Sequence, residues 1–236
     1  MERDYQIIVW GATGFTGQIV TEYLHNNYGN GIRWAIAGRN LEKLQNVKQN
    51  LQLDANIECL VGDSFDEASL KSISSRTDVI ISTVGPYVLY GKALVSACVQ
   101  TKTDYCDLTG EIPFVKDSID SFHEQARANE VKIVHSCGYD SIPSDIGCLL
   151  LQEKAKEKYG QPASNVKLFV LGTKGKFSGG TVASMINLMK EAKDPEKRQI
   201  QSDPYILCKD VIAGMPNQRI QNFVWYDPRI EKWTAP

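Results

Sequence analysis

The chain has 236 residues, of which 42% are hydrophobic and 23% are charged, and its formal net charge is −2. This composition is typical of a globular protein, and the length suits one large domain or one domain with part of a second. A nearly neutral chain lacks the basic bias of nucleic-acid-binding proteins, so we expect no nucleic-acid partner. No apolar run approaches the roughly 18 residues of a membrane span, and no signal-peptide core follows Met1. We therefore expect a cytoplasmic or other intracellular protein.

The cysteines and histidines give no metal-ligand spacing, so we expect no metal. The six cysteines stand alone, without a CxxC pair, and are expected to be free thiols in a reducing compartment. They are Cys59, Cys98, Cys106, Cys137, Cys148 and Cys208.

From residue 5 to about residue 158, short apolar runs alternate with amphipathic patterns, which predicts an α/β fold with a parallel sheet. Strands are predicted at residues 6–10, 34–37, 57–61, 79–83, 104–108 and 132–135. Helices are predicted at residues 15–28, 41–51, 93–99 and 119–128, the second of them capped by Asn40. Short β-branched runs of this kind suit strands that crossover helices bury on both faces, as in a doubly wound Rossmann-type sheet.

The regular alternation of strand and helix patterns ends after His135. Residues 136–145 are rich in Gly, Ser, Pro and Asp, and a helix at 144–158, a strand at 166–171 and a helix at 182–192 are predicted to follow. Beyond Asp194-Pro195 the pattern weakens, and no strand ladder completes a second unit. The sequence therefore predicts a Rossmann-type domain over residues 1–136 and an incomplete second α+β domain over residues 137–236, as in a fragment of a longer protein.

A glycine-rich turn directly follows the first predicted strand and opens the first helix. Gly11 lets the chain turn tightly, Gly14 lets a dinucleotide pyrophosphate approach the backbone, and Gly17 lets helix and sheet pack closely. The alternative is a turn that needs small residues and binds nothing, but the strand–turn–helix context favours a dinucleotide. The expected contacts are Gly11, Thr13, Gly14, Phe15, Thr16 and Gly17.

The second strand ends at Arg39, about 20 residues beyond the glycine turn, where NAD-binding domains place an acidic residue. A guanidinium in this place holds the 2′-phosphate of NADP, so we expect NADP(H) as the cofactor. Asn40 and Lys43 are included in the expected site. The alternative for Arg39 and Lys43 is a pair of solvated surface cations.

Further cofactor contacts are expected where the third and fourth strands end. Asp63 accepts from the adenine amino group or caps the next helix. The segment Val84-Gly85-Pro86-Tyr87 lies at the carboxyl edge, where ligands of doubly wound sheets bind. Tyr87 packs on the ribose or lines the core.

Taken together, these motifs resemble the saccharopine dehydrogenase-like oxidoreductases, including their branch of trans-acting enoyl reductases. The resemblance covers about residues 5–190 and rests on the blocks at residues 11–17, 37–39, 85–87, 105–111 and 138–145, with Ser178-Gly179-Gly180-Thr181 and Ser184 typical of the enoyl-reductase branch. It implies a second domain that covers the nicotinamide, and a substrate that is an amino-acid adduct, hence imine-type, or a lipid-linked enoyl intermediate. Members of this family are usually longer than this chain.

No acid–base pair stands out for catalysis. Glu111 and Asp140 follow the fifth and sixth strands and orient substrate or shuttle a proton, although for each the commoner role is a helix-capping carboxylate. Tyr139 donates a proton or packs, and Tyr87 is a further candidate.

Two alternatives to this enzyme remain. The lack of a clear acid–base pair also fits an NADP-sensing module without catalysis. Tyr205 and Lys209 match the Tyr-x-x-x-Lys of short-chain reductases, but they lie far downstream of the place that pair has in that family. A small-molecule or lipid-linked substrate, a homodimer and a peripheral lipid association complete the expectations.

Overall fold

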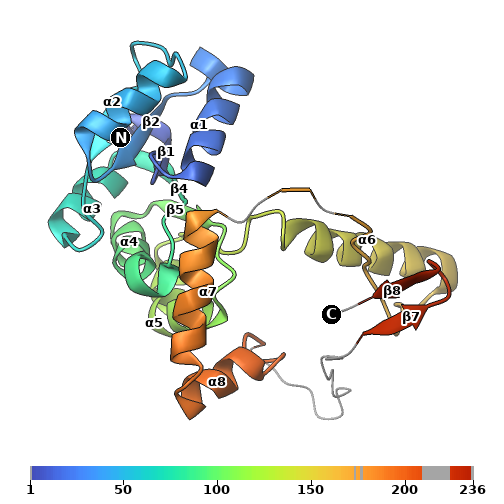
Figure 1. Ribbon diagram of the computed structural model, residues 1–236. Helices are drawn as coiled ribbons and strands as arrows, with labels where there is room; N and C mark the ends of the chain where they lie inside the picture. The colour runs from blue at the N-terminus through green and yellow to red at the C-terminus, as the bar shows by residue number, and fades with distance from the viewer. Residues whose placement is uncertain (1, 173, 176–177, 209–223, 235–236) are drawn as a thin grey trace.

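The computed structural model describes residues 2–172, 174–175, 178–208 and 224–234, and its centre is one parallel sheet of six strands (Figure 1). The strands are β1 (Tyr5–Trp10), β2 (Trp34–Gly38), β3 (Glu58–Val61), β4 (Thr77–Ser82), β5 (Asp104–Asp107) and β6 (Ile133–Val134). Their order across the sheet, β3-β2-β1-β4-β5-β6, is that of the doubly wound dinucleotide-binding fold. The predicted fold class is confirmed, and the six predicted strands are all present.

The strand order reverses beside β1, which pairs with β2 on one side and with β4 on the other. Trp10 lies opposite Ala37 in β2 and Ser82 in β4, so the three strands end at the same level. The loops that follow them diverge to opposite faces of the sheet and leave a crevice at this edge.

Helices cover the two faces of the sheet in separate groups. Apolar residues of α3 (Glu67–Ser74), α4 (Tyr87–Thr101) and α5 (Ile112–Ala128) form one core with Ile8, Ile80 and Tyr105. Residues of α1 (Phe15–Tyr28) and α2 (Leu41–Asn50) form the other core with Val9 and Ile36. Neighbouring strand residues thus enter opposite cores, as the two-residue period of a strand requires.

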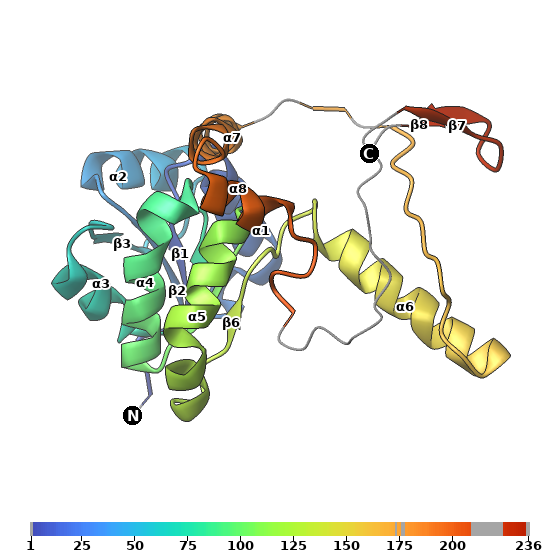
Figure 2. The same cartoon turned by 90° about the horizontal axis from the view of Figure 1, so that it is seen from below.

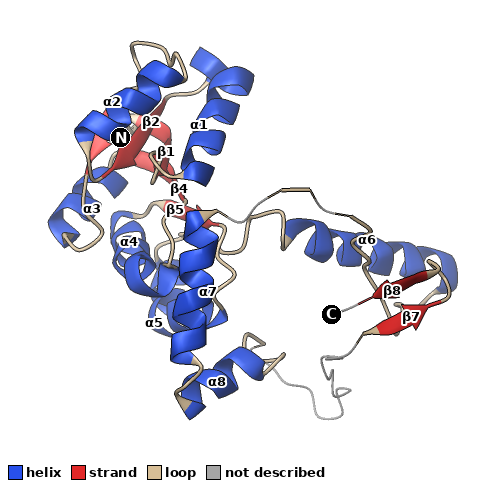
Figure 3. Cartoon of the chain, in the orientation of Figure 1, coloured by secondary structure: helices blue, strands red, loops and turns tan. Residues whose placement is uncertain are grey.

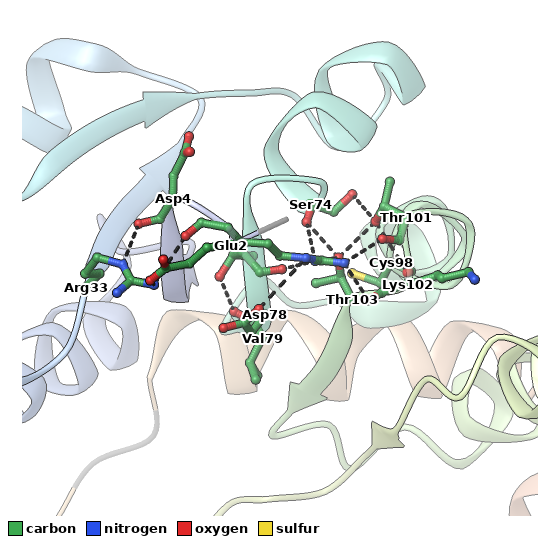
Figure 4. A network of polar contacts seen from close by, with 12 residues as sticks. Glu2, Asp4, Arg33, Ser74, Asp78, Val79, Cys98, Thr101, Lys102 and Thr103 are labelled. Carbon is green, nitrogen blue, oxygen red and sulfur yellow. Dashed lines mark hydrogen bonds and ion pairs between the residues drawn. The ribbon is translucent and has the colours of Figure 1, made fainter.

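The amino edge of the sheet is fastened by Arg3. Its guanidinium donates to Thr103 Oγ1 (2.5 Å) and to the carbonyl oxygens of Ser74 (3.3 Å), Thr77, Thr101 (2.8 Å) and Lys102 (2.7 Å) (Figure 4). These acceptors belong to the ends of α3 and α4 and the starts of β4 and β5. One side chain therefore ties four elements together at the edge opposite the crevice.

The chain beyond β6 forms α6 (Ile142–Tyr159), α7 (Gly179–Glu191), α8 (Pro195–Ser202) and a hairpin of β7 (Trp225–Asp227) and β8 (Lys232–Thr234). Both α6 and the hairpin extend away from the sheet, whereas α7 and α8 lie beside the Rossmann-type unit (Figures 1 and 2). None of the described helices is long and apolar enough to cross a membrane.

The strand predicted at residues 166–171 is wrong, because this stretch is loop in the structure (Figure 3). A strand needs a neighbour for its backbone hydrogen bonds, and no strand of the described chain pairs with this apolar run. No element was predicted at α3, at α8 or at the hairpin of β7 and β8.

Candidate cofactor site

A cavity of about 440 Å³ lies at the carboxyl edge of the sheet, over the point where the strand order reverses. Its walls come from the loops after β1, β2, β3 and β4 and from the start of α7. The residues that line it are Trp10, Gly11, Thr13, Gly14, Phe15, Thr16, Gly38, Arg39, Ser64, Thr83, Val84, Gly85, Ser178, Gly179 and Gly180.

The glycine turn forms the floor of this cavity, and its shape depends on missing side chains. Gly11 has φ +90°, and a Cβ added there would lie 2.5 Å from Val84 Cγ2. A Cβ on Gly17 would lie 2.1 Å from the carbonyl oxygen of Gly11. Gly17 does not line the cavity but lets α1 start against the turn.

The start of α1 is open to a ligand. Gly14 is its N-cap, carries no side chain and therefore leaves the first turn without a side-chain cap. Helix N-termini that lack a cap hold free N–H groups and the positive end of the helix dipole, the combination that binds phosphate. Thr13 and Thr16 lie beside this point in the lining. The turn therefore fits a dinucleotide pyrophosphate.

Arg39 lies at the end of β2 in the lining of the same cavity. Its side chain is exposed, and within the described part of the chain it makes no hydrogen bond or ion pair. A guanidinium without a protein partner beside a phosphate-binding turn suits a 2′-phosphate. Asn40 caps α2, with Oδ1 accepting from Lys43 N at 2.9 Å, and neither residue lines the cavity.

Of the contacts predicted after the third and fourth strands, some line the cavity and others do not. Asp63 Oδ1 accepts from Phe65 N at 2.8 Å, and the neighbouring Ser64 lines the cavity instead. Val84 and Gly85 are in the lining, as predicted for the nicotinamide half.

Pro86 and Tyr87 lie behind the cavity rather than in its lining. The Gly85–Pro86 peptide is cis, and Pro86 is the N-cap of α4. Tyr87 is buried, its hydroxyl donates to the Ser82 carbonyl at 3.1 Å, and burial raises its pKa. The structure thus places Tyr87 in the core, the second of the two predicted roles.

Glu111 is almost fully buried, with 1% of its surface exposed. Its Oε1 accepts from Tyr87 N (2.9 Å) and from the hydroxyl of Ser184 in α7 (2.6 Å), and its Oε2 accepts from Val88 N (2.9 Å). Both oxygens are therefore engaged, and the carboxylate lies at the positive start of α4. This arrangement commits the carboxylate to the start of α4 and to α7, and it gives Glu111 a positioning role.

A second cavity of about 350 Å³ adjoins the first, and Thr16 lines both. It lies between α1 and the ends of β4 and β5. Tyr139 and Asp140 are in its wall, and in the described chain neither side chain forms a hydrogen bond or ion pair. Tyr139 is 74% exposed. Its residues are Thr16, Val20, Ile81, Cys106, Asp107, Leu108, Thr109, Gly110, Cys137, Gly138, Tyr139, Asp140 and Ser141.

The wall of the second cavity is braced by a buried chain of polar side chains. Asp107 Oδ2 lies 2.7 Å from His135 Nδ1, and His135 Nε2 lies 3.0 Å from Ser118 Oγ. The order Ser-His-Asp is that of a hydrolase triad, but Ser118 is only 3% exposed within α5, so no substrate reaches its hydroxyl. Asp107 Oδ1 also accepts from Thr109 N and Ser136 N, both at 3.1 Å, so the group fixes two loops.

The structure does not place Tyr205 in a short-chain-reductase site. Tyr205 lies in a turn after α8, whereas that family carries its tyrosine on a helix packed against the sheet, and Lys209 lies outside the described residues. The described residues also hold no cluster of three or more His, Cys, Asp or Glu that could bind a metal.

Several lining residues were not among the predicted contacts, and Ser64 and Ser178 are two of them. Ser64 follows a strand end, a position that sequence alone marks as ligand-facing once the strand is recognised. Ser178 comes from a segment far away in the sequence, and no local pattern indicates that it lies opposite the glycine turn.

Comparison with known proteins agrees with this geometry. The family model described as the saccharopine dehydrogenase NADP binding domain matches residues 7–134, which contain the carboxyl ends of all six strands of the sheet and most of the cavity lining. This match confirms NADP(H) as the cofactor.

Relatives and one solved structure extend the comparison. A protein of Mycobacterium tuberculosis, provisionally named trans-acting enoyl reductase, is 40% identical over 210 residues, which are 88% of this chain and 50% of that protein. The trans-acting enoyl reductase of Mycobacterium ulcerans is 38% identical over 212 residues, 89% of this chain and 50% of the relative. The chain thus spans about half the length of these relatives. Apo saccharopine dehydrogenase (L-Glu forming) of Saccharomyces cerevisiae has the same fold, with a TM-score of 0.51 and 20% identity over 65% of this chain and 31% of that one. The chain belongs to the family defined by the saccharopine dehydrogenase NADP binding domain.

Proposed function

We propose that this chain is the cofactor-binding part of an NADP(H)-dependent oxidoreductase that reduces an enoyl or imine-type substrate. The observation that carries the proposal is a single cavity that contains both the phosphate-binding glycine turn and the unpaired guanidinium of Arg39. The second cavity, joined at Thr16, supplies a place for a substrate beside the cofactor.

When bound, NADPH supplies the hydride, and the protein positions the substrate and delivers a proton. We propose Tyr139 and Asp140 for the proton, because both line the second cavity and neither has a side-chain partner in the described chain. Glu111 and Tyr87 act elsewhere in this proposal. Their polar atoms are buried and engaged with the protein, so they hold the loop after β4 in place.

For the substrate we favour an enoyl compound, because the relatives with 38–40% identity carry the name trans-acting enoyl reductase, and we propose that this compound is lipid-linked. The apolar side chains of Val20, Ile81 and Leu108 in the second cavity suit an acyl chain. An intracellular location, a peripheral contact with lipid and a homodimer belong to the same proposal. So does a boundary that separates the NADP-binding domain at 1–136 from a substrate-covering part at 137–236, close to the end of the family match at residue 134.

The test is a titration of the chain with NADPH and with NADH, followed by nucleotide fluorescence. We expect NADPH to bind at least tenfold more tightly, about 1.4 kcal/mol, and Arg39→Ala to remove this preference by weakening NADPH alone. The reason is that the two nucleotides differ only in the 2′-phosphate.

Two further variants complete the test, one as a control and one as a probe of a second cation. Arg127→Ala removes an exposed arginine from the last turn of α5 and should leave both affinities unchanged. Lys43→Ala asks whether a second cation, one turn into α2, adds to the preference. Equal binding of both nucleotides by the unmodified chain would refute the role of Arg39.

Turnover is tested separately, with enoyl thioesters and imines and with Tyr139→Phe and Asp140→Asn. Loss of NADPH oxidation with unchanged NADPH affinity in either variant supports its role as proton donor. Binding without turnover on every substrate class would favour an NADP-sensing module instead.

A further inference from the structure

We propose that α7 forms the outer wall of the NADP(H) cleft and that the hydrogen bond from Ser184 to Glu111 holds it there. This inference rests on the cofactor site proposed above and assigns to it a segment beyond the family match, which ends at residue 134. In it, Ser178, Gly179 and Gly180 are cofactor-facing residues, whereas Ser184 and Glu111 are positioning residues.

The cleft is lined by residues from two distant parts of the chain. Ser178, Gly179 and Gly180 share one cavity with Gly14 and Arg39, although they lie more than 130 residues further along the chain. The start of α7 is well defined, because Ser178 Oγ caps it by accepting from Thr181 N at 3.1 Å. The glycine turn and α7 therefore face each other across the space in which a dinucleotide would lie.

A hydrogen bond from Ser184 holds α7 against the Rossmann-type unit. Ser184 lies about one and a half turns into α7, and its hydroxyl donates to Glu111 Oε1 at 2.6 Å. Ser184 Oγ also lies 3.2 Å from the place where a Cβ on Gly85 would be, so the helix rests on the loop that lines the nicotinamide half of the cleft. Hydrogen bonds to a charged partner contribute more than neutral ones.

The carboxylate that accepts this hydrogen bond is itself held in place. Glu111 is 1% exposed and also accepts from the backbone N–H groups of Tyr87 and Val88. One carboxylate thus fixes the start of α4 and the seat of α7 together. A carboxylate held in this way has no freedom to follow α7 if the helix moves, so the contact defines one position of the wall.

The remainder of α7 is only partly covered. Val182, Met185, Ile186 and Met189 are between 43% and 72% exposed, and α7 has no buried residue. Among the described residues, Ser184 makes the only hydrogen bond between α7 and the Rossmann-type unit. Its loss should change cofactor binding more than global stability.

The experiment measures NADPH affinity for the unmodified chain, Ser184→Ala, Glu111→Gln and the double variant. We expect Ser184→Ala to weaken NADPH binding about tenfold and to keep the preference for NADPH over NADH, because Arg39 is unchanged. The loss in the double variant should be smaller than the sum of the two single losses, since both changes act on the same contact. Ser121→Ala removes an exposed serine hydroxyl that bonds only within α5, and it should bind NADPH normally.

Hydrogen exchange separates positioning from a general loss of structure. NADPH should slow exchange of the α7 amides in the unmodified chain and in Ser121→Ala but not in Ser184→Ala. Unchanged affinity and unchanged α7 protection in Ser184→Ala would overturn the inference while leaving the cofactor site intact. Failure of the unmodified chain to bind either nucleotide would overturn the cofactor site, and the inference with it.

Discussion

Individual residues shape the cleft in two main ways: they lack a side chain where the backbone needs room, or they accept hydrogen bonds from backbone N–H groups. Gly17 leaves room for the carbonyl oxygen of Gly11, and Glu111 holds the N–H groups at the start of α4. Only Arg39 is a charged side chain with no partner in the described chain and a place in the lining of the cleft. Recognition of the nucleotide therefore depends on one guanidinium together with the backbone of the glycine turn.

Gly17→Ala should destabilise the chain by about 2 kcal/mol and weaken NADPH binding, because the added Cβ would lie 2.1 Å from a backbone oxygen that has no room to move. Urea unfolding and NADPH titration measure the two effects. Gly31→Ala is the matched control, since a Cβ there meets no atom within 4 Å. Equal stability of the two variants would contradict the close approach of α1 to the turn.

At the scale of elements, the carboxyl edge of the sheet forms the cofactor cleft, and the amino edge holds strands and helices together. The carboxyl edge leaves the uncapped start of α1 and the guanidinium of Arg39 open to a ligand, whereas Arg3 binds the amino edge through five acceptors on four elements. Stability and cofactor binding should therefore respond separately to changes at the two edges.

Arg3→Met should lower the free energy of unfolding by about 2 kcal/mol, because it leaves several partly buried acceptors without a donor. NADPH affinity should stay within twofold of the unmodified chain, since the guanidinium lies at the edge far from the cleft. Arg33→Met, which removes an exposed ion pair with Glu2, should cost at most about 0.5 kcal/mol. Chemical unfolding of the unmodified chain, Arg3→Met and Arg33→Met measures these differences in stability. A loss of NADPH affinity in Arg3→Met would contradict the independence of the two edges.

Local pattern was sufficient for the strands and for the glycine turn, because strand period and turn chemistry are written in neighbouring residues. It failed for residues 166–171, whose apolar run has strand propensity but no strand beside it in the described chain. It also missed α3, although Asp66 caps that helix by accepting from Ala68 N and Ser69 N. The role of Ser178 and Ser184 depends on how α7 meets the sheet, which no short window of sequence contains.

At the scale of the whole molecule, the buried thiols and phenols link stability to pH. Burial raises the pKa of the Cys106 thiol to about 12, from an ordinary value of 9.0, and the pKa values of Cys98 and Tyr105 are raised for the same reason. Above pH 9 the unfolded chain releases the Cys106 proton while the folded chain retains it. The contribution of Cys106 to the free energy of unfolding is therefore fully present below pH 9 and is lost as the pH rises toward 12.

We expect the free energy of unfolding to fall between pH 8 and pH 10, with Cys106 responsible for about 1 kcal/mol of the fall. Cys106→Ala removes this group, so its stability should decline less over the same interval. Urea unfolding at the two pH values gives the comparison. A parallel decline in both proteins would show that Cys106 ionises as readily in the folded chain as in the unfolded one.

The strand order also has a consequence for synthesis of the chain on the ribosome. Of the six strands of the sheet, β1 is made first and becomes an inner strand, and its neighbour on one side, β4, ends only at Ser82. An emerging chain therefore carries β1 with one edge open until translation has passed Ser82. Open edges pair readily with foreign strands. The arrangement that creates the nucleotide crevice thus exposes β1 to misassembly until β4 has been made.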